Sequence, residues 1–130
     1  MIFIDTNYFL RFLIKEDDKL HQEALRVITD AAEGRAKTGT SVVVIFEIYW
    51  VLSSFYQMDK AHVAGLLIKL LQMEFVNIEN RNILAQAIDL YQKTPLDLED
   101  SYNLFYAKQN GYEKFMTFDK ILKKTADKYF

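Results

Sequence analysis

Short apolar runs alternate with amphipathic stretches along the chain. Ile2–Ile4 is a brief apolar run that begins almost at the first residue and predicts a buried strand. Asp5-Thr6-Asn7 follows it, and three short polar residues in a row are typical of a turn that leads into a helix. Before Gly34, apolar residues recur at helical spacing, which predicts a helix over Leu20, Ala24, Val27, Ile28 and Ala31.

The middle of the chain combines two expected strands with two expected helices. Thr38–Thr40 and Phe75–Ile78 are predicted strands. Val42–Phe55 begins with β-branched residues, which favour a strand, but the segment is long for a strand and Ser41 suits a helix N-cap. We therefore expect a buried helix there. The next helix begins after Asp59, and its apolar stripe consists of Ala64, Leu67, Ile68 and Leu71.

The last third of the chain continues the alternation. Asn80 opens one helix, and a second covers Asp100–Asn110. We expect a strand over Lys114–Phe118 and a final helix over Ile121–Lys128. Strands separated by helices indicate a parallel sheet covered on both faces, so we expect an α/β fold in one domain over residues 1–130.

Composition and charge narrow the class of protein. A chain of 130 residues that is 51% hydrophobic suits a compact domain, and the absence of cysteine excludes disulfides and zinc–thiolate sites. A formal net charge of -2 gives no overall positive field for nucleic acid, although local patches can still bind it. Asp5 interrupts the apolar start, and the longest apolar run, Val42–Leu52, is too short to cross a bilayer. We expect a cytoplasmic protein with no membrane segment.

Two aspartates come directly after predicted strands. Asp5 follows Ile2–Ile4, and Asp119 follows Met116-Thr117-Phe118. Ligands of α/β sheets bind beyond the carboxyl ends of the strands, so both carboxylates are candidates for a functional site. An ordinary helix N-cap explains either aspartate equally well.

Glu47 stands among apolar residues. Its neighbours three and four positions away on a helix are Val43, Val44, Trp50 and Val51. We therefore expect a carboxylate surrounded by hydrophobic side chains that is paired or holds a metal, because burying an unpaired charge costs several kcal/mol. An ion pair with a lysine or arginine is the alternative.

Three further acids cluster after the Pro95 break. Asp100 is expected to begin a helix, Asp97 lies one turn earlier, and Glu99 lies between them. An N-cap accounts for one of these acids but not for all three.

Four carboxylates from distant parts of the chain are thus expected at one edge of the sheet: Asp5, Glu47, Asp100 and Asp119. Without compensation they would repel one another, and a hard divalent cation removes that conflict because Mg²⁺ prefers oxygen ligands. The matching chemistry is phosphodiester hydrolysis by metal-bound water. The polar side chains expected to orient ligands or water from behind are Thr6, Asn7, Asp97 and Thr117.

Four stretches, in this order, resemble the PIN-domain nucleases. Ile4-Asp5-Thr6-Asn7 is similar to the opening strand and first aspartate of that family, and Glu47 within Val44–Leu52 is similar to its second acidic position. Leu98-Glu99-Asp100 ahead of an amphipathic helix resembles the third position, and Phe115–Asp119 resembles the closing strand-Thr-x-Asp element. The resemblance covers nearly the whole chain.

The resemblance implies a three-layer α/β/α sandwich with a central parallel sheet. It implies an endoribonuclease that depends on Mg²⁺ or Mn²⁺, with Asp5, Glu47, Asp100 and Asp119 as its metal-binding and catalytic residues. Asp97 competes with Asp100 for the third position, and Asp100 is favoured because it begins the helix. Small members are often VapC-like toxins, dimeric and blocked by an antitoxin. We therefore expect a homodimer, an antitoxin partner and an RNA substrate, which is tRNA, rRNA or mRNA.

Basic side chains close in sequence to the acids are candidates for contacts to RNA phosphates. They are Arg11, Lys15, Lys120, Lys123 and Lys124. A solvated helix face that keeps the protein soluble explains these lysines about as well. Aromatic residues around the first and third helices are numerous enough that some are expected at the surface, where they favour an interface.

Other readings remain open at this point. A PIN-fold nuclease that processes RNA as a housekeeping enzyme and a catalytically silent module that binds RNA or acts as a scaffold both fit the pattern. A phosphatase with an aspartate nucleophile is disfavoured, because the position two residues after Asp5 holds Asn7 instead of a second aspartate.

Overall fold

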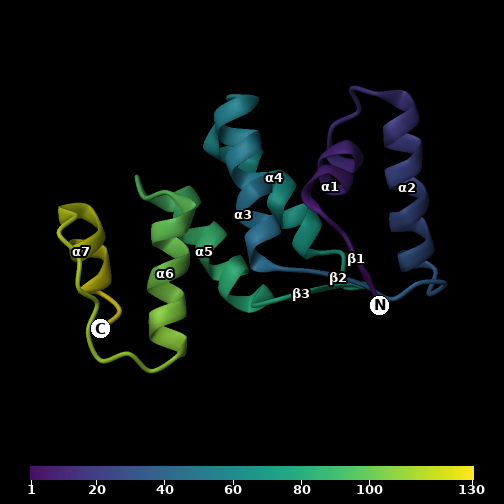
Figure 1. Cartoon of the computed structure of the whole chain (residues 1–130). Coiled ribbons are helices and arrows are strands. Elements are labelled where there is room, and N and C mark those ends of the chain that lie inside the picture. Colours follow the sequence, from purple (N-terminus) through teal and green to yellow (C-terminus); the bar gives the residue numbers. More distant parts are fainter.

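The computed structural model describes all 130 residues as seven α-helices, one π-helical turn and three short strands (Figure 1). The first half of the chain forms β1 (Ile2–Phe3), α1 (Thr6–Leu13), α2 (Asp18–Ala32), β2 (Thr38–Thr40), α3 (Val42–Trp50) and the π turn η1 (Val51–Phe55). The second half forms α4 (Lys60–Leu71), β3 (Val76–Ile78), α5 (Arg81–Lys93), α6 (Leu98–Gln109) and α7 (Lys120–Ala126).

The three strands form one parallel sheet in the order β1-β2-β3. In the register of the sheet Phe3 lies beside Gly39, and Gly39 lies beside Asn77. The helices rise on one side of the strands in Figure 1, and on the other side the side chains of Phe3 and Asn77 are exposed. The predicted α/β class with a parallel sheet is confirmed, and the helices cover one face of this small open sheet instead of both.

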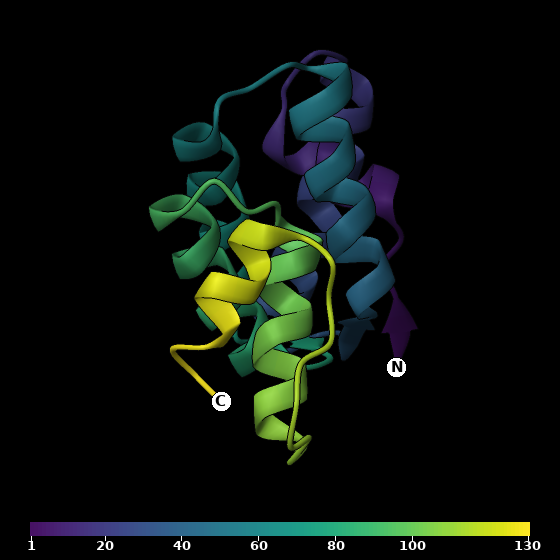
Figure 2. The same cartoon turned by 90° about the vertical axis from the view of Figure 1, so that its left-hand side faces the viewer.

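Most of the hydrophobic core lies between the sheet and the helices α1, α3, α4 and α5. Phe9, Ile45, Ile48 and Leu52 are fully buried there, so the apolar stripes of α1 and α3 face each other in the interior. A second, smaller cluster joins the end of α5 to α6 and α7, and Figure 2 shows α7 packed in front of α6. Its members are Leu90, Leu96, Leu104, Leu122 and Ala126.

Local capping signals in the sequence correspond to real helix starts. The Ser41 side chain accepts a hydrogen bond from the backbone N–H of Val44, and Asp59 accepts one from that of His62 at 2.8 Å. Val42–Phe55 is helical, as predicted, but its last turn is the wider π form. No helix of the structure combines the length and the apolar character needed to cross a membrane.

One predicted strand is wrong. Lys114–Phe118 forms no strand, and residues 113–118 make no backbone hydrogen bond. A strand exists only where a neighbouring chain segment completes its hydrogen bonds, and no such segment lies beside these residues. The sheet therefore ends at β1, whose outer edge has no partner strand.

Candidate active site

The carboxyl end of β1 leads directly into the first part of the site. Asp5 occupies the N-cap position of α1, but its side chain makes no capping hydrogen bond, and the residue is exposed. Thr6, which is buried, donates a hydrogen bond from Oγ1 to Glu47 Oε2 at 3.1 Å. The strand end itself is held by Thr40, whose Oγ1 donates to the carbonyl oxygen of Ile4 at 2.8 Å. Thr6 therefore links the start of α1, which Asp5 precedes, to Glu47 on α3.

The surroundings of Glu47 differ from the expectation. Glu47 is exposed, and so are Val43 and Trp50 on the same face of α3. The expectation of a carboxylate enclosed by hydrophobic side chains is wrong because no other element covers this face. The alternative of an ion pair is absent too, since Glu47 forms no salt bridge. An exposed carboxylate held by one threonine hydroxyl remains available to a ligand.

The second acidic group lies at the start of α6. The helix begins at Leu98, and the N-cap is Asp97, whose side chain accepts a hydrogen bond from the backbone N–H of Asp100 at 2.8 Å. The expectation that Asp100 begins the helix is therefore wrong, since Asp97 satisfies the free N–H groups of the first turn. The Asp100 carboxylate is half-buried, has no such capping role and forms no salt bridge.

Two contacts between α3 and α6 fix this helix start beside Glu47. The backbone N–H of Leu98 donates to the hydroxyl of Tyr49 at 3.5 Å, and burial raises the pKa of Tyr49 to about 12. The Phe46 and Tyr102 rings pack edge to face with centroids 5.2 Å apart. Phe46 directly precedes Glu47 and Tyr49 follows it two positions later, so the same turn of α3 that carries Glu47 contacts α6.

The loop before α6 is anchored by Lys60. Its Nζ donates hydrogen bonds to the carbonyl oxygens of Tyr91, Thr94 and Leu96 at 3.1, 2.9 and 2.7 Å. Partial burial lowers the pKa of Lys60, and the nearby charge of Asp97 opposes that shift. The Lys60 ammonium thus ties the end of α5 to the turn that presents the acids.

The acids at the start of α6 repel one another. Partial burial is the main cause that raises the pKa of Asp100, and the charges of Asp97 and Asp119 raise it further. The pKa of Glu99 is raised in the same way, first by partial burial and then by Asp97. The start of α6 therefore carries negative charges that lie close to one another.

Asp119 is the N-cap of α7. Its side chain accepts a hydrogen bond from the backbone N–H of Leu122 at 2.8 Å, and its own N–H donates to Thr117 Oγ1 at 3.1 Å. The capping explanation considered for the two aspartates thus describes Asp119 and not Asp5. The charge of Asp119 is one of the causes that raise the pKa of Asp100.

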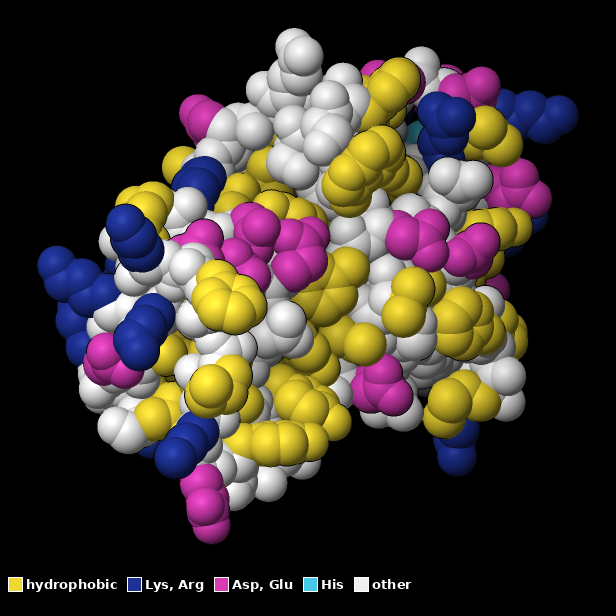
Figure 3. Space-filling model, turned by 60° about the vertical axis from the view of Figure 1, so that its left-hand side comes forward, with side chains coloured by type: hydrophobic (Ala, Val, Ile, Leu, Met, Phe, Trp, Pro, Cys, Tyr) yellow, Lys and Arg dark blue, Asp and Glu magenta, His cyan; other side chains and the backbone are white.

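The donor set suits a hard divalent cation. Asp5, Glu47, Asp100 and Asp119 offer carboxylate oxygens, and none of them takes part in a salt bridge. Figure 3 shows acidic side chains gathered on one face, with lysines and arginines to one side of them. In this arrangement no three acidic or histidine side chains lie close enough together to hold one ion.

The remaining predicted residues fall into two groups. Thr6 supports Glu47 as described, whereas Asn7 is exposed and lines a cleft with Arg11 between α1 and α2. Arg11 and Lys15 lie near acidic partners, at 3.9 Å from Glu16 and 3.8 Å from Asp18. The α7 lysines, by contrast, are exposed and form no salt bridge: Lys120, Lys123 and Lys124.

Sequence reasoning about the site missed two features. No local sequence pattern predicts that the Tyr49 hydroxyl accepts a hydrogen bond from α6, because Tyr49 and Leu98 are far apart in the sequence. The exposed groove between α1 and the end of α3 was foreseen only as a surplus of aromatic residues. It is lined by Asn7, Leu10, Arg11, Trp50, Val51, Phe55 and Tyr56.

Comparison with known proteins agrees with this architecture. The family model described as the PIN domain matches residues 2–128. A VapC ribonuclease from Aquifex aeolicus (strain VF5) is 24% identical over 128 residues, and the match covers 98% of this chain and 94% of that protein. The matched region contains both acidic groups and all three strands of the sheet, and the chain therefore belongs to the PIN domain family.

Proposed function

We propose that this protein is a divalent-metal-dependent endoribonuclease that acts as the toxin of a toxin–antitoxin pair. The observation that carries the proposal is the set of carboxylates at the carboxyl end of β1 and the start of α6, none of which is neutralised by a base. Membership of the PIN domain family and the similarity to a VapC ribonuclease support the same reaction.

Each acidic residue has a distinct task in this proposal. Asp5, Glu47, Asp100 and Asp119 would hold Mg²⁺ or Mn²⁺, and the bound ion would supply an activated water and positive charge for the scissile phosphate. Thr6 fixes the orientation of Glu47 through its hydroxyl. Asp97 keeps the first turn of α6 closed, so that Asp100 is presented without being used as a cap.

The RNA backbone is bound by basic side chains beside the acids. Lys120, Lys123 and Lys124 lie on α7, directly after Asp119, and carry charges that no acidic side chain neutralises. Arg11 and Lys15 extend the basic surface from α1, where phosphates compete with Glu16 and Asp18 for them. Binding is therefore expected to weaken steeply as salt concentration rises.

The antitoxin is expected in the exposed groove between α1 and the end of α3. Trp50 and Phe55 are largely exposed there, and Arg11 adds one positive charge at the rim. Such a groove suits an apolar peptide segment that also carries an acidic residue. The protein acts in the cytoplasm as a homodimer in this proposal.

A catalytically silent RNA-binding module is the second candidate. It is favoured by the observation that no three acidic side chains share one ion site in the structure. The two candidates differ in Asp5→Asn, which leaves RNA binding intact in both but removes cleavage only in an enzyme.

The deciding experiment incubates the purified protein with total tRNA and rRNA, with Mg²⁺, with Mn²⁺ or with a chelator. Asp5→Asn is the site variant, and Glu74→Gln is the matched control, because Glu74 is an exposed acid outside the site. Fragments that need metal, persist in Glu74→Gln and vanish in Asp5→Asn support the nuclease. RNA that is bound but never cut supports the silent module.

A further inference from the structure

A row of three aromatic rings begins next to Glu47 and continues along α6. Phe46, which directly precedes Glu47, packs edge to face against Tyr102 with the ring centroids 5.2 Å apart. The Tyr102 ring in turn lies 5.9 Å from the Tyr106 ring, and the planes of these two rings are tilted by only 31°. The row therefore leads from one of the candidate acids to Tyr106.

The Tyr106 ring is the exposed end of this row. Tyr102 is buried, and its hydroxyl accepts a hydrogen bond from Asn80 Nδ2 at 2.8 Å, which holds the middle ring in place. One side of the Tyr106 ring lies against Tyr102, whereas 38% of the residue remains exposed. Leu104 is fully buried, so α6 itself is a firm support. A ring that is already held in this way loses little conformational freedom when a planar ligand stacks on it.

Tyr106 shares a face of α6 with the acids at the start of the helix. Glu99, Asn103 and Tyr106 are spaced by four and three residues, so they lie on one stripe, and all three are exposed. Asp100 and Tyr106 are six residues apart, which corresponds to about 9 Å along the helix axis. An amide and an aromatic ring therefore follow directly after the acids on an open helix face.

Positive charge lies on the helix that packs against α6. Figure 2 shows α7 in front of α6, and the two helices share the cluster that includes Leu104 and Leu122. Lys120 and Lys123 on α7 are exposed and form no salt bridge. A polyanion with planar, uncharged groups matches both the lysines and the open face of α6.

The exposed ring favours an unpaired base over a base pair. In an RNA duplex the bases are paired and stacked on one another, so a ring on the protein surface cannot stack on them. An unpaired base can turn out of the strand, stack on an aromatic side chain and expose its edge to an amide. Asn103 carries such an amide one turn before Tyr106.

We infer that Tyr106 is the stacking platform for an unpaired base close to the scissile phosphate of the RNA, and that Asn103 hydrogen-bonds to the edge of the same base. The inference rests on the proposed nuclease function, because the acids at the start of α6 define where the scissile phosphate lies. It adds a residue that selects the conformation of the RNA and a second residue that selects the base. Neither residue touches the metal ligands or takes part in the bond cleavage.

Binding without cleavage tests the platform. The probes are short single-stranded oligoribonucleotides, each with the fluorescent base 2-aminopurine at a different position, and the duplexes made from them. A chelator is present, so that no probe is cut. Stacking on an aromatic ring quenches 2-aminopurine, which reports the contact itself and not only the affinity.

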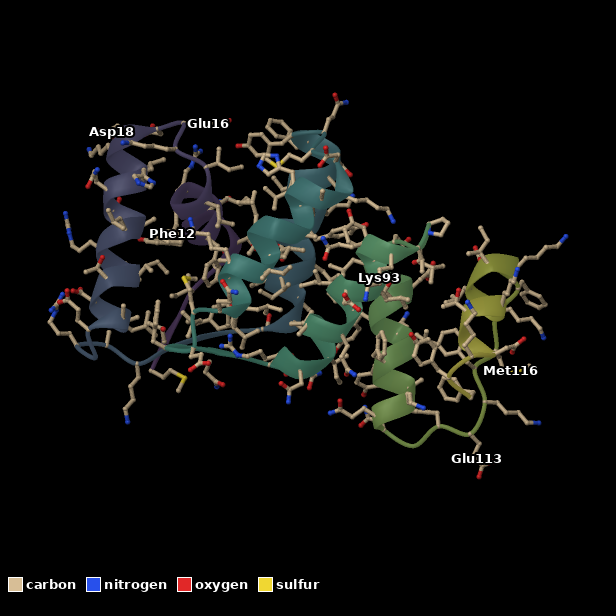
Figure 4. All side chains as sticks on the ribbon, turned by 180° about the vertical axis from the view of Figure 1, so that it is seen from behind. Phe12, Glu16, Asp18, Lys93, Glu113 and Met116 are labelled. Carbon is tan, nitrogen blue, oxygen red and sulfur yellow. The ribbon has the colours of Figure 1, made fainter.

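The variants separate the ring from its bulk. Tyr106→Leu keeps an apolar side chain against Tyr102 but removes the ring, Tyr106→Phe restores a ring, and Asn103→Ala removes the amide. Tyr112→Ala is the matched control, because Tyr112 is a 58% exposed tyrosine beyond the end of α6. It directly precedes Glu113, which Figure 4 shows at the outer end of the molecule.

Tyr106→Leu should weaken binding of the single strands on the order of 10-fold, the size expected for the loss of one stacked base. It should also abolish the quenching at one probe position, and Tyr106→Phe should restore both. Asn103→Ala should weaken binding for some bases at that position and not for others. Tyr112→Ala should bind like the wild type, and the duplexes should not distinguish Tyr106→Leu from the wild type.

Several results would overturn the platform. They are wild-type affinity and quenching in Tyr106→Leu, an equal loss in Tyr112→Ala, or an equal loss for duplexes and single strands. Circular dichroism and the urea midpoint of Tyr106→Leu show whether the fold is retained, and Tyr106→Phe provides the same test if it is not.

Cleavage of the same RNA with Mg²⁺ separates this inference from the proposed function. A wild-type protein that cleaves RNA, together with unchanged binding in Tyr106→Leu, would refute the platform alone. Quenching that depends on Tyr106 in a protein that never cleaves RNA would refute the nuclease and leave the platform in place. A wild-type protein that binds no RNA would refute both.

Discussion

Two segments of this chain have almost the same sequence pattern, but only one of them forms a strand. Ile2–Ile4 and Phe115–Phe118 are short apolar stretches, and each is followed by an aspartate at the N-cap position of a helix. The first pairs with β2, and Ile4 is buried. The second has no backbone partner, and Phe118 is fully exposed.

The difference shows that strand formation depends on the neighbour and not on the residues alone. Both segments have side chains that favour a strand, but only Ile2–Ile4 meets a chain segment that can complete its hydrogen bonds. The two aspartates that follow these segments also differ in their hydrogen bonds. Asp119 caps α7 through its side chain, whereas the Asp5 carboxylate makes no capping bond and is free for a ligand.

In cleavage the two aspartates should behave alike, because both are expected to be needed for the reaction. Asp5→Asn and Asp119→Asn should each lower the cleavage rate on the order of 1,000-fold, since either change removes a charged metal ligand. The rate is measured under single-turnover conditions with saturating Mg²⁺. A loss in Asp5→Asn alone would mean that Asp119 serves only as a helix cap.

The two apolar stretches should differ in how much they contribute to the free energy of unfolding. Ile4→Ala should lower the free energy of unfolding by about 3 kcal/mol, because the side chain is buried in the main core. Phe118→Ala should change it by less than about 0.5 kcal/mol when the protein is dilute enough to be monomeric, because the ring is exposed. Urea unfolding measures both. Equal costs would place Phe118 in the core of its own chain.

The two aspartates should also differ in their contribution to stability. Asp119→Ala should cost about 1 kcal/mol, because α7 loses its N-cap hydrogen bond, and Asp119→Asn should retain most of that stability. Asp5→Ala should have a smaller effect, since its side chain makes no cap bond. Thermal unfolding of the three variants without metal separates these cases. A large loss in Asp5→Ala would contradict the free carboxylate.

The smallest expected difference concerns Thr40, at the end of β2, and Thr117, in the segment before α7. Thr40→Val should cost about 1 kcal/mol, because a buried hydrogen bond to the Ile4 carbonyl is lost. Thr117→Val should cost less, because water replaces the hydrogen bond to the N–H of Asp119 at an exposed site. Urea midpoints of the two variants provide the test. A larger cost for Thr117→Val would indicate that its segment is buried.

The order of helices and most of their starts follow from the sequence itself. Ser41 and Asp59 cap helices because a short polar side chain satisfies free N–H groups within three residues, and this interaction needs no distant partner. The same local reasoning identified Asp5 and Asp119 as helix-start aspartates after apolar stretches. The α/β class follows from the alternation of these elements.

The surroundings of the acidic residues and the pairing of strands depend on contacts between distant parts of the chain, which local sequence patterns do not contain. Glu47 is exposed because nothing covers its face of α3, and its hydrogen bond joins it to Thr6, 41 positions away in the sequence. Asp97, and not Asp100, caps α6, in a loop that Tyr49 and Lys60 also hold through hydrogen bonds. Phe115–Phe118 stayed without a strand partner because hydrogen bonds between strands need a second segment in place, which a single stretch of sequence does not supply.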